Sequence, residues 1–166
     1  MSMDKTLISD KLKTRFTEDI LSVEDNKDML TVEVSAKIIH EVIRFLKEND
    51  SLGFTFLTTL CGIHYPDQKL PLGVVYHLHR FSDNTRIRIK AFMPLENPTI
   101  STVSDLFSAA NWMERETYDF YGILFEGHPN LKRILNVEYL DYFPMRKEYP
   151  LEDQTREDKD NRFFGR

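Results

Sequence analysis

The feature of the sequence that most constrains the fold is a pair of strand-like runs joined by a short polar turn. The runs are Gly73–Phe81 and Thr85–Met93, and Ser82-Asp83-Asn84 between them has the composition of a tight turn. Successive side chains of a strand point to opposite faces. In the second run Ile87 and Ile89 therefore share one face, and the other face carries three basic residues: Arg86, Arg88 and Lys90. A hairpin needs further strands or a helix packed on its apolar face, so the sequence predicts a sheet with a second layer.

Segments with helical spacing can supply that second layer. Apolar periodicity predicts helices over residues 9–20, 36–50 and 106–121, and alternation predicts further strands over residues 30–34 and 54–60. Thr102, with Asp105 three residues later, is expected to cap the start of the last helix, and Gly122 to end it. This order of elements predicts an α+β fold, a two-layer sandwich of a small mixed sheet with helices on one face.

The pattern and composition of the sequence change after Leu135. The remaining residues show neither a helical nor a strand period, and they are heavily charged, yet they include several aromatic residues: Tyr139, Tyr142, Phe143, Tyr149, Phe163 and Phe164. Disordered tails are poor in aromatic residues. We therefore expect a globular domain over residues 1–135 and an extended C-terminal arm, residues 136–166, that binds a partner. The alternative is that this segment folds back on its own domain.

Charge and composition exclude several classes of function. The net charge of −5 disfavours general binding to nucleic acid, although the basic residues of the 85–93 run form one cationic strand face. Cys61 is the single cysteine, so no intramolecular disulfide forms and a reducing compartment is expected. The N-terminus lacks the apolar stretch of a signal peptide, and no apolar run approaches the length of about 20 residues that a membrane span needs.

Two residue groups are candidates for chemistry. Glu116 and Asp119 lie three apart on the last predicted helix, as a general acid–base pair could, although such carboxylates more often pair with cations, here Arg115, Lys132 or Arg133. A second group offers four nitrogen or sulfur ligands for zinc, at a spacing of no familiar type: Cys61, His64, His77 and His79. The absence of a C-x2-C pattern argues against an iron–sulfur cluster in this chain.

Docking on another protein is the remaining interpretation. Tryptophan, tyrosine and arginine dominate the energetics of protein interfaces, and the last third of the chain is rich in them: Trp112, Arg115, Tyr118, Tyr121, Arg146 and Tyr149. Some of these side chains, notably Trp112, are expected to fill the domain's own core. His128, between Gly127 and Pro129, is expected to pin its loop through a hydrogen bond.

Two segments carry a resemblance to a known family. Residues 111–135, NWMERETYDFYGILFEGHPNLKRIL, closely resemble the signature of the C subunit of the proton-pumping NADH-quinone oxidoreductase, respiratory complex I. The segment PMRKEYPL, residues 144–151, resembles that family's PLRKDYPL, with Met145 and Glu148 replacing leucine and aspartate. Residues 75–78 and 86–90 are similar to its middle strands. The resemblance covers the second half of the chain strongly and the first half through the order of its elements.

This resemblance implies a non-catalytic scaffold subunit of a translocase that passes electrons from NADH to quinone. The implied location is the peripheral arm of the complex, on the cytoplasmic side of the bacterial inner (plasma) membrane, with membrane contact only through the complex. The implied partners are the D subunit and other peripheral-arm subunits. FMN and iron–sulfur clusters are expected in partner subunits, and none in this chain. The alternatives are an equivalent scaffold in a membrane-bound hydrogenase or related dehydrogenase, and a small metal-dependent enzyme.

Neither catalytic residues nor cofactor or metal ligands are therefore expected in this chain, and the isolated chain is expected to have no catalytic activity. The residues expected to form its structural and interface motif are Trp112, Glu114, Arg115, Glu116, Asp119, Gly122, Gly127, His128, Pro129, Arg133, Arg146, Lys147, Tyr149 and Pro150.

Overall fold

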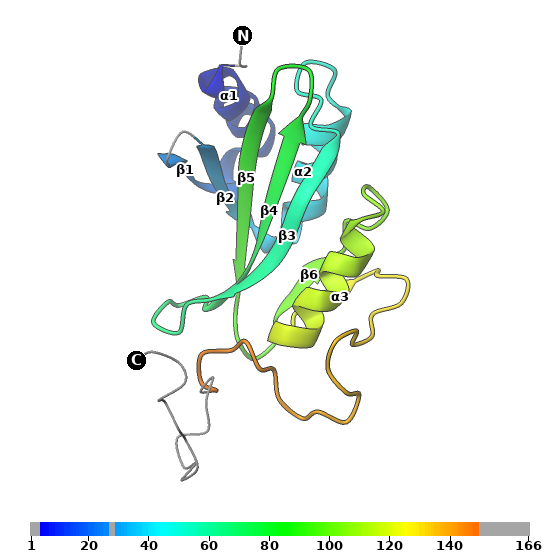
Figure 1. Cartoon of the computed structure of the whole chain (residues 1–166). Coiled ribbons are helices and arrows are strands. Elements are labelled where there is room, and N and C mark those ends of the chain that lie inside the picture. Colours follow the sequence, from blue (N-terminus) through cyan, green and yellow to red (C-terminus); the bar gives the residue numbers. More distant parts are fainter. Residues whose placement is uncertain (1–3, 27–28, 150–166) are drawn as a thin grey trace, which may run out of the picture.

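A computed structural model describes residues 4–26 and 29–149 of the chain (Figure 1). Its helices are α1 (Lys5–Phe16), α2 (Ile39–Glu48) and α3 (Ala110–Tyr121), with short 3-10 turns η1 (Thr17–Asp19) and η2 (Ala36–Ile38). Its strands are β1 (Ile20–Asn26), β2 (Met29–Ser35), β3 (Phe56–His64), β4 (Leu72–Arg80), β5 (Thr85–Met93), β6 (Thr99–Ser101) and β7 (Leu124–Glu126).

The strands form one main sheet. Within the described residues it has five strands in the order β1-β2-β5-β4-β3, with β2 parallel to β5 and the other neighbours antiparallel (Figure 1). β6 and β7 pair with each other in parallel. The predicted hairpin is confirmed: Arg80 pairs with Thr85, and Asn84 takes the positive φ of 58° that a tight hairpin turn uses.

The core lies between this sheet and helices α1 and α2, which cover the same face (Figure 1). The predicted apolar stripe of α2 is fully buried: Ile39, Val42, Ile43 and Leu46. It meets the buried side of β5, where Ile87 and Ile89 are also fully buried. Each such aliphatic side chain contributes about 1.5–3 kcal/mol when it leaves water. The predicted α+β two-layer fold is confirmed.

The first helix was placed too late in the sequence. It begins after Asp4, whose carboxylate accepts the N–H of Thr6 at 2.9 Å, and it ends at Phe16. Ile20, assigned to the helix by its spacing, instead begins β1, a strand the periodicity did not predict. Among the described strands β1 lies at the edge of the sheet and pairs with β2 alone. Its conformation therefore depends on pairing with a neighbour that local spacing does not reveal.

The last helix begins later than predicted. α3 starts at Ala110, and Thr102 does not cap it, because residues 102–109 form a turn that follows β6. The predicted end is confirmed, since Gly122 takes a left-handed φ of 73°. α3 packs along the edge strand β3. No helix in the described ranges is long and apolar enough to cross a bilayer.

Candidate docking site

Helix α3 buries two carboxylates where an ordinary amphipathic helix would bury apolar groups. Its buried residues are Ala110, Glu114, Thr117 and Asp119. A buried charge is costly unless other groups hydrogen-bond or neutralise it. The partners of the two carboxylates therefore indicate which segments α3 holds in place.

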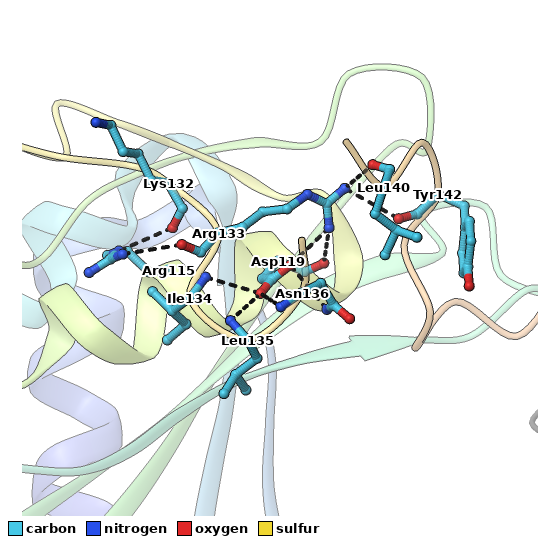
Figure 2. Close-up of polar contacts among 9 residues, drawn as sticks. All are labelled: Arg115, Asp119, Lys132, Arg133, Ile134, Leu135, Asn136, Leu140 and Tyr142. Carbon is cyan, nitrogen blue, oxygen red and sulfur yellow. Dashed lines mark hydrogen bonds and ion pairs between the residues drawn. The ribbon is translucent and has the colours of Figure 1, made fainter. Parts of the chain in front are cut away.

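Asp119 binds the chain that follows β7 (Figure 2). Its Oδ2 accepts three successive backbone N–H groups, from Ile134 at 3.1 Å, Leu135 at 2.8 Å and Asn136 at 2.9 Å. Its Oδ1 accepts the Asn136 side-chain amide at 3.1 Å and the Arg133 guanidinium at 2.8 Å. One buried carboxylate thus fixes the chain over four consecutive residues.

These bonds set the ionisation of Asp119. Burial by itself raises the pKa of this carboxyl, but the backbone amides of Asn136 and Leu135 and the side chain of Arg133 favour the charged form. The balance holds the pKa of Asp119 well below its usual range. The side chain is therefore a permanent anion at neutral pH, and it serves as an anchor.

Arg133 extends the anchor further along the chain. Besides Asp119, its guanidinium donates to the carbonyls of Leu140 at 2.8 Å and Tyr142 at 3.3 Å (Figure 2). The same group lies 5.0 Å from the centre of the Phe143 ring. Because an arginine presents five donors in a rigid fork, one side chain can join α3 to two later turns.

Phe143 and Arg146 close the arm against the end of α3. Arg146 Nε donates to the Tyr121 carbonyl at 2.7 Å, and its guanidinium lies 4.7 Å from the centre of the Phe143 ring. That ring occupies the space beside Gly122, where an added Cβ would lie 2.5 Å from a ring carbon. Glycine is therefore needed at position 122 for two reasons: its φ is positive, and the Phe143 ring leaves no space for a Cβ.

The described part of the arm, residues 136–149, is fastened to the domain (Figure 1). The Met145 N–H donates to the Phe120 carbonyl at 3.2 Å, and the Lys147 N–H donates to Nδ1 of buried His64 at 3.0 Å. These residues contain no helix or strand, as expected, and their contacts fit the alternative in which the segment folds back. Residues 150–166, including Pro150, lie outside the described residues, and the domain boundary at residue 135 stays a prediction.

Glu114, the second buried carboxylate, holds the chain that precedes α3. It accepts the Val103 N–H at 2.7 Å and the Thr102 hydroxyl. His128 Nε2, from the loop after β7, lies 4.0 Å from it. Thr102 therefore serves as a donor to the middle of α3, which explains why it does not cap the helix.

The ionisation of Glu114 differs from that of Asp119. Burial is the largest effect and raises the pKa of Glu114 to about 7, although the hydrogen bonds from Thr102 and Val103 oppose it. The hydroxyl of Tyr76, the one described buried side-chain atom without a hydrogen-bond partner, lies in the same region, and the negative charge of Glu114 adds to the burial that raises the pKa of Tyr76. Asp119 accepts from a cation, a side-chain amide and three backbone N–H groups, whereas two groups among the described residues donate to Glu114.

His128 pins its loop, as predicted. Its Nε2 donates to the Asn111 carbonyl at 3.1 Å, and its Nδ1 accepts the Asn130 N–H at 3.0 Å. Gly127 beside it has a φ of 80°, which supports the turn. Pro129 on the other side is exposed. The loop is thereby tied to the first turn of α3.

The prediction that Trp112 fills the core is wrong. Its side chain is 63% exposed, and the Arg115 guanidinium lies 5.1 Å from the centre of its ring. Arg115 also donates to the carbonyls of Lys132 at 3.1 Å and Arg133 at 3.2 Å. Because β3 packs against the opposite side of α3, position 112 faces outward.

Several large apolar side chains are exposed on α3, on the arm and at Leu135 just before it, and we call them the arm surface. They are Trp112, Leu135, Val137, Tyr139, Tyr142, Met145 and Tyr149. Tyr139 is 87% exposed, and the rings of Tyr142 and Tyr149 lie 5.0 Å apart. Aromatic groups at a rigidly held, exposed site are typical of interface anchors.

The acid–base hypothesis does not fit this geometry. Asp119 is held ionised by its donors and cannot release a proton near neutral pH. Glu116 is exposed and lies beside Cys61 in a cavity of about 320 Å³ between β3 and α3. The two carboxylates thus face different surroundings, and they do not form a pair.

The four candidate zinc ligands are not brought together. Cys61 and His64, three apart on β3, point to opposite faces of the sheet, with Cys61 exposed and His64 buried. His77 accepts a hydrogen bond from Arg88, and His79 bonds to Asn84. No cluster of three or more histidine, cysteine or acidic residues in the described ranges is placed to hold a metal ion.

Sequence reasoning singled out most of the charged anchors and named Arg133 among the cations that pair with them, which is confirmed for Asp119, but it missed the other partners. Asn136, Thr102 and Val103 complete the two carboxylate sites, and Phe143 packs beside Gly122. Their types carry no distinctive signal, because backbone N–H groups make most of the contacts. The available signal was the density of acidic residues along the last predicted helix, although Asp119 lies off its apolar stripe and is buried by the chain that follows.

The chain is similar to proteins of one well-defined family. The model of the family described as "Respiratory-chain NADH dehydrogenase, 30 Kd subunit" matches residues 32–155. The C subunit of the NADH-quinone oxidoreductase of Roseiflexus sp. (strain RS-1) is 37% identical over 151 residues, which cover 91% of this chain and 87% of that protein. The corresponding C subunit of Geobacter metallireducens is 38% identical over 148 residues, which cover 89% of this chain and 90% of that protein.

Two solved structures share the fold. A trypsin-resistant fragment of Nqo5 superposes with a TM-score of 0.64 at 33% identity, over 75% of this chain and 98% of that one. A chain of a membrane-bound sulfane sulfur reductase, an archaeal respiratory membrane complex, superposes with a TM-score of 0.72 over 88% of this chain and 85% of that one. The second chain is 22% identical, so it shows likeness of fold alone.

Proposed function

This chain belongs to the family of the 30-kDa subunit of respiratory-chain NADH dehydrogenase, and from that premise we propose that it is the docking scaffold of its complex. As a subunit of an NADH-quinone oxidoreductase, it works inside a multisubunit assembly. In this proposal it docks on the D subunit through the arm surface and holds the neighbouring peripheral-arm subunits in fixed positions. It contributes no catalytic group of its own.

The observation that carries the proposal is the anchoring of an exposed aromatic arm by buried charge. Breaking one partner of a buried ion pair is costly because it leaves the other uncompensated. The bonds from Asp119 and Arg133 therefore hold the arm in one conformation before any partner binds. A pre-organised surface loses less conformational entropy on binding than a flexible tail would.

The proposal extends to location and cofactors. The scaffold lies in the peripheral arm, on the cytoplasmic side of the bacterial inner membrane, and it meets the membrane only through the complex. FMN and iron–sulfur clusters belong to its partner subunits. Electron transfer between such centres depends on fixed spacing, and a rigid scaffold of this kind maintains that spacing.

The test is assembly of a tagged chain in cells that lack the native one. The variant Tyr139→Ser/Leu135→Ser alters two exposed side chains of the arm surface, and Leu21→Ser alters a comparably exposed side chain on β1. We expect the arm variant to lower recovery of the complex from detergent-solubilised membranes by about tenfold, because interface anchors each contribute about 1–2 kcal/mol or more. Leu21→Ser should have no effect.

The complexes that do form should retain normal NADH-driven quinone reduction per complex, because the chain supplies no reacting group. Equal recovery of the two variants would contradict docking through the arm surface. Recovery of a nickel-containing partner in place of a flavin-containing one would assign the chain to a hydrogenase assembly.

A further inference from the structure

The face of the main sheet turned away from α1 and α2 carries a row of cations on β5. Arg86, Arg88 and Lys90 alternate there with the buried Ile87 and Ile89. Side chains two apart on a strand are separated by about 7 Å, so the row presents three positive charges at regular intervals. It lies on a chain whose net charge is −5, so it does not simply reflect composition.

The cations of this row are not held in ion pairs within the described ranges. None of the three makes an ion pair with a described acidic residue. Arg88 Nε donates to His77 Nε2 at 2.7 Å, and burial together with the charge of Arg88 lowers the pKa of His77. A neutral imidazole orients the Arg88 guanidinium without cancelling its charge.

Exposed aromatic residues lie at both ends of the row. At the hairpin end, the Phe56 and Phe81 rings lie 5.1 Å apart, and Phe81 is 64% exposed. At the other end, the Tyr65 and Phe92 rings lie 6.0 Å apart, and Tyr65 is exposed. Arginine and aromatic groups together are enriched at the energetic centres of protein interfaces.

We propose that this surface, the basic face, docks an extended acidic segment of a second polypeptide in the same assembly. Carboxylates at alternate residues of such a segment match the spacing of Arg86, Arg88 and Lys90, and its apolar residues pack on the two aromatic pairs. On the same face Glu33 of β2 is the registered neighbour of Lys90, and Glu24 of β1 pairs with Thr31, the registered neighbour of Arg88. Their charges repel the segment from the β1–β2 half and direct it onto β4 and β5.

A polypeptide fits this surface better than the other polyanions. Nucleic acid binding draws on many phosphate contacts, whereas this row offers three cations beside two carboxylates on an acidic protein. The basic face and the arm surface share no residue, so this inference does not depend on docking through the arm.

The first test is direct binding to the full-length chain. The probe is a fluorescent peptide of nine residues, the length of β5, with glutamate at alternate positions and tyrosine at both ends. We expect binding that weakens as salt rises. The variant Arg86→Glu/Lys90→Glu should bind the probe at least about tenfold more weakly, because two attractions become repulsions. The matched control, Lys13→Glu/Lys37→Glu, reverses two exposed lysines elsewhere and should bind as the wild type does.

Three results would overturn the proposal: equal binding of a lysine-substituted probe, equal binding by the two double variants, or tighter binding to phosphatidylglycerol vesicles than to the peptide. Matching circular dichroism and denaturation midpoints establish that the variants fold.

The second test is assembly in membranes, where the basic-face variant should lower recovery of the complex and its lysine control should not. If the arm variant assembles normally and the basic-face variant does not, docking through the arm fails while this inference stands. The reverse pattern, together with no peptide binding, removes this inference and leaves the arm in place.

Discussion

At the scale of single residues, Asp119 and Glu114 show how similar side chains on one helix take different roles. Asp119 has a cation and three backbone N–H groups around it, and its pKa is held low. Glu114 has two hydrogen-bond donors, and its pKa is raised to about 7. Burial is common to both, so the number and charge of the donors decide the outcome.

Replacing Asp119 should destabilise the fold far more than replacing its exposed neighbour Glu116. In Asp119→Ala the Arg133 guanidinium, 7% exposed, loses its counter-ion, and three backbone N–H groups lose their acceptor. We expect the free energy of unfolding to fall by about 3–5 kcal/mol, against about 0.5 kcal/mol or less for Glu116→Ala. Urea denaturation measures both.

If Asp119→Ala does not fold, the milder Asp119→Asn keeps the shape and one acceptor and still lacks the charge. A denaturation midpoint for Asp119→Asn equal to that of the wild type would show that the anchor does not depend on charge.

Glu114 should make stability depend on pH in a direction opposite to most carboxylates. Its folded pKa lies above its unfolded value, so the folded state holds the proton more tightly. The contribution of Glu114 protonation to the stability of the folded state is fully present below about pH 4.5, and it is lost as the pH rises through about 7. The free energy of unfolding of the wild type, measured relative to that of Glu114→Gln, should fall by about 2 kcal/mol between about pH 5.5 and pH 8. Urea denaturation of both proteins at the two pH values measures this difference, and a constant difference would contradict the assignment.

At the scale of elements, α3 works as a clamp between the segments before and after it. Glu114 holds residues 102–103, and Asp119 holds residues 134–136. Gly122 ends the helix where the Phe143 ring packs. The helix thereby sets the path of the described arm although the arm has no regular structure of its own.

Two truncations separate the contribution of the arm from that of the residues beyond it. A chain that ends at Leu135 loses the amides of Asn136 and the carbonyls of Leu140 and Tyr142. We expect its free energy of unfolding to fall by about 2–4 kcal/mol, because each lost hydrogen bond costs about 0.5–1.5 kcal/mol. The core between the sheet and α2 lies outside the arm, so the domain should still fold.

A chain that ends at Tyr149 is the control, because it retains all of these contacts. Thermal denaturation followed by circular dichroism compares the two. Equal midpoints would mean that the arm does not stabilise the domain.

At the scale of the whole molecule, one α+β domain presents two kinds of surface. α1 and α2 cover one face of the sheet (Figure 1). The basic face lies on the other, where no described helix covers it, and α3 packs along β3. A scaffold with two separate surfaces can hold two neighbours at once. Simultaneous contact of this kind raises the strength of assembly without requiring either contact to be strong.

Periodicity in the sequence predicted much of this fold, and its failures have a common cause. The hairpin of β4 and β5 and helix α2 were predicted because their patterns are strong and local. β1, β6 and β7 were missed because short strands at an edge or in a small pair depend on their partners. The start of α3 was misplaced because Thr102 donates to Glu114 twelve residues away.

The features of the candidate site also fall into those that the sequence determined and those that only the tertiary structure decided. The sequence by itself determined the layer arrangement, the family and the identity of most charged anchors, because apolar periodicity and a long motif are properties of the chain. Only the tertiary structure decided that Trp112 is exposed, that Asp119 binds a run of backbone N–H groups, and that Cys61 and His64 lie on opposite faces. Those outcomes depend on which segments meet in space. Because every residue except proline carries a backbone N–H, the sequence does not reveal which of these groups a side chain binds.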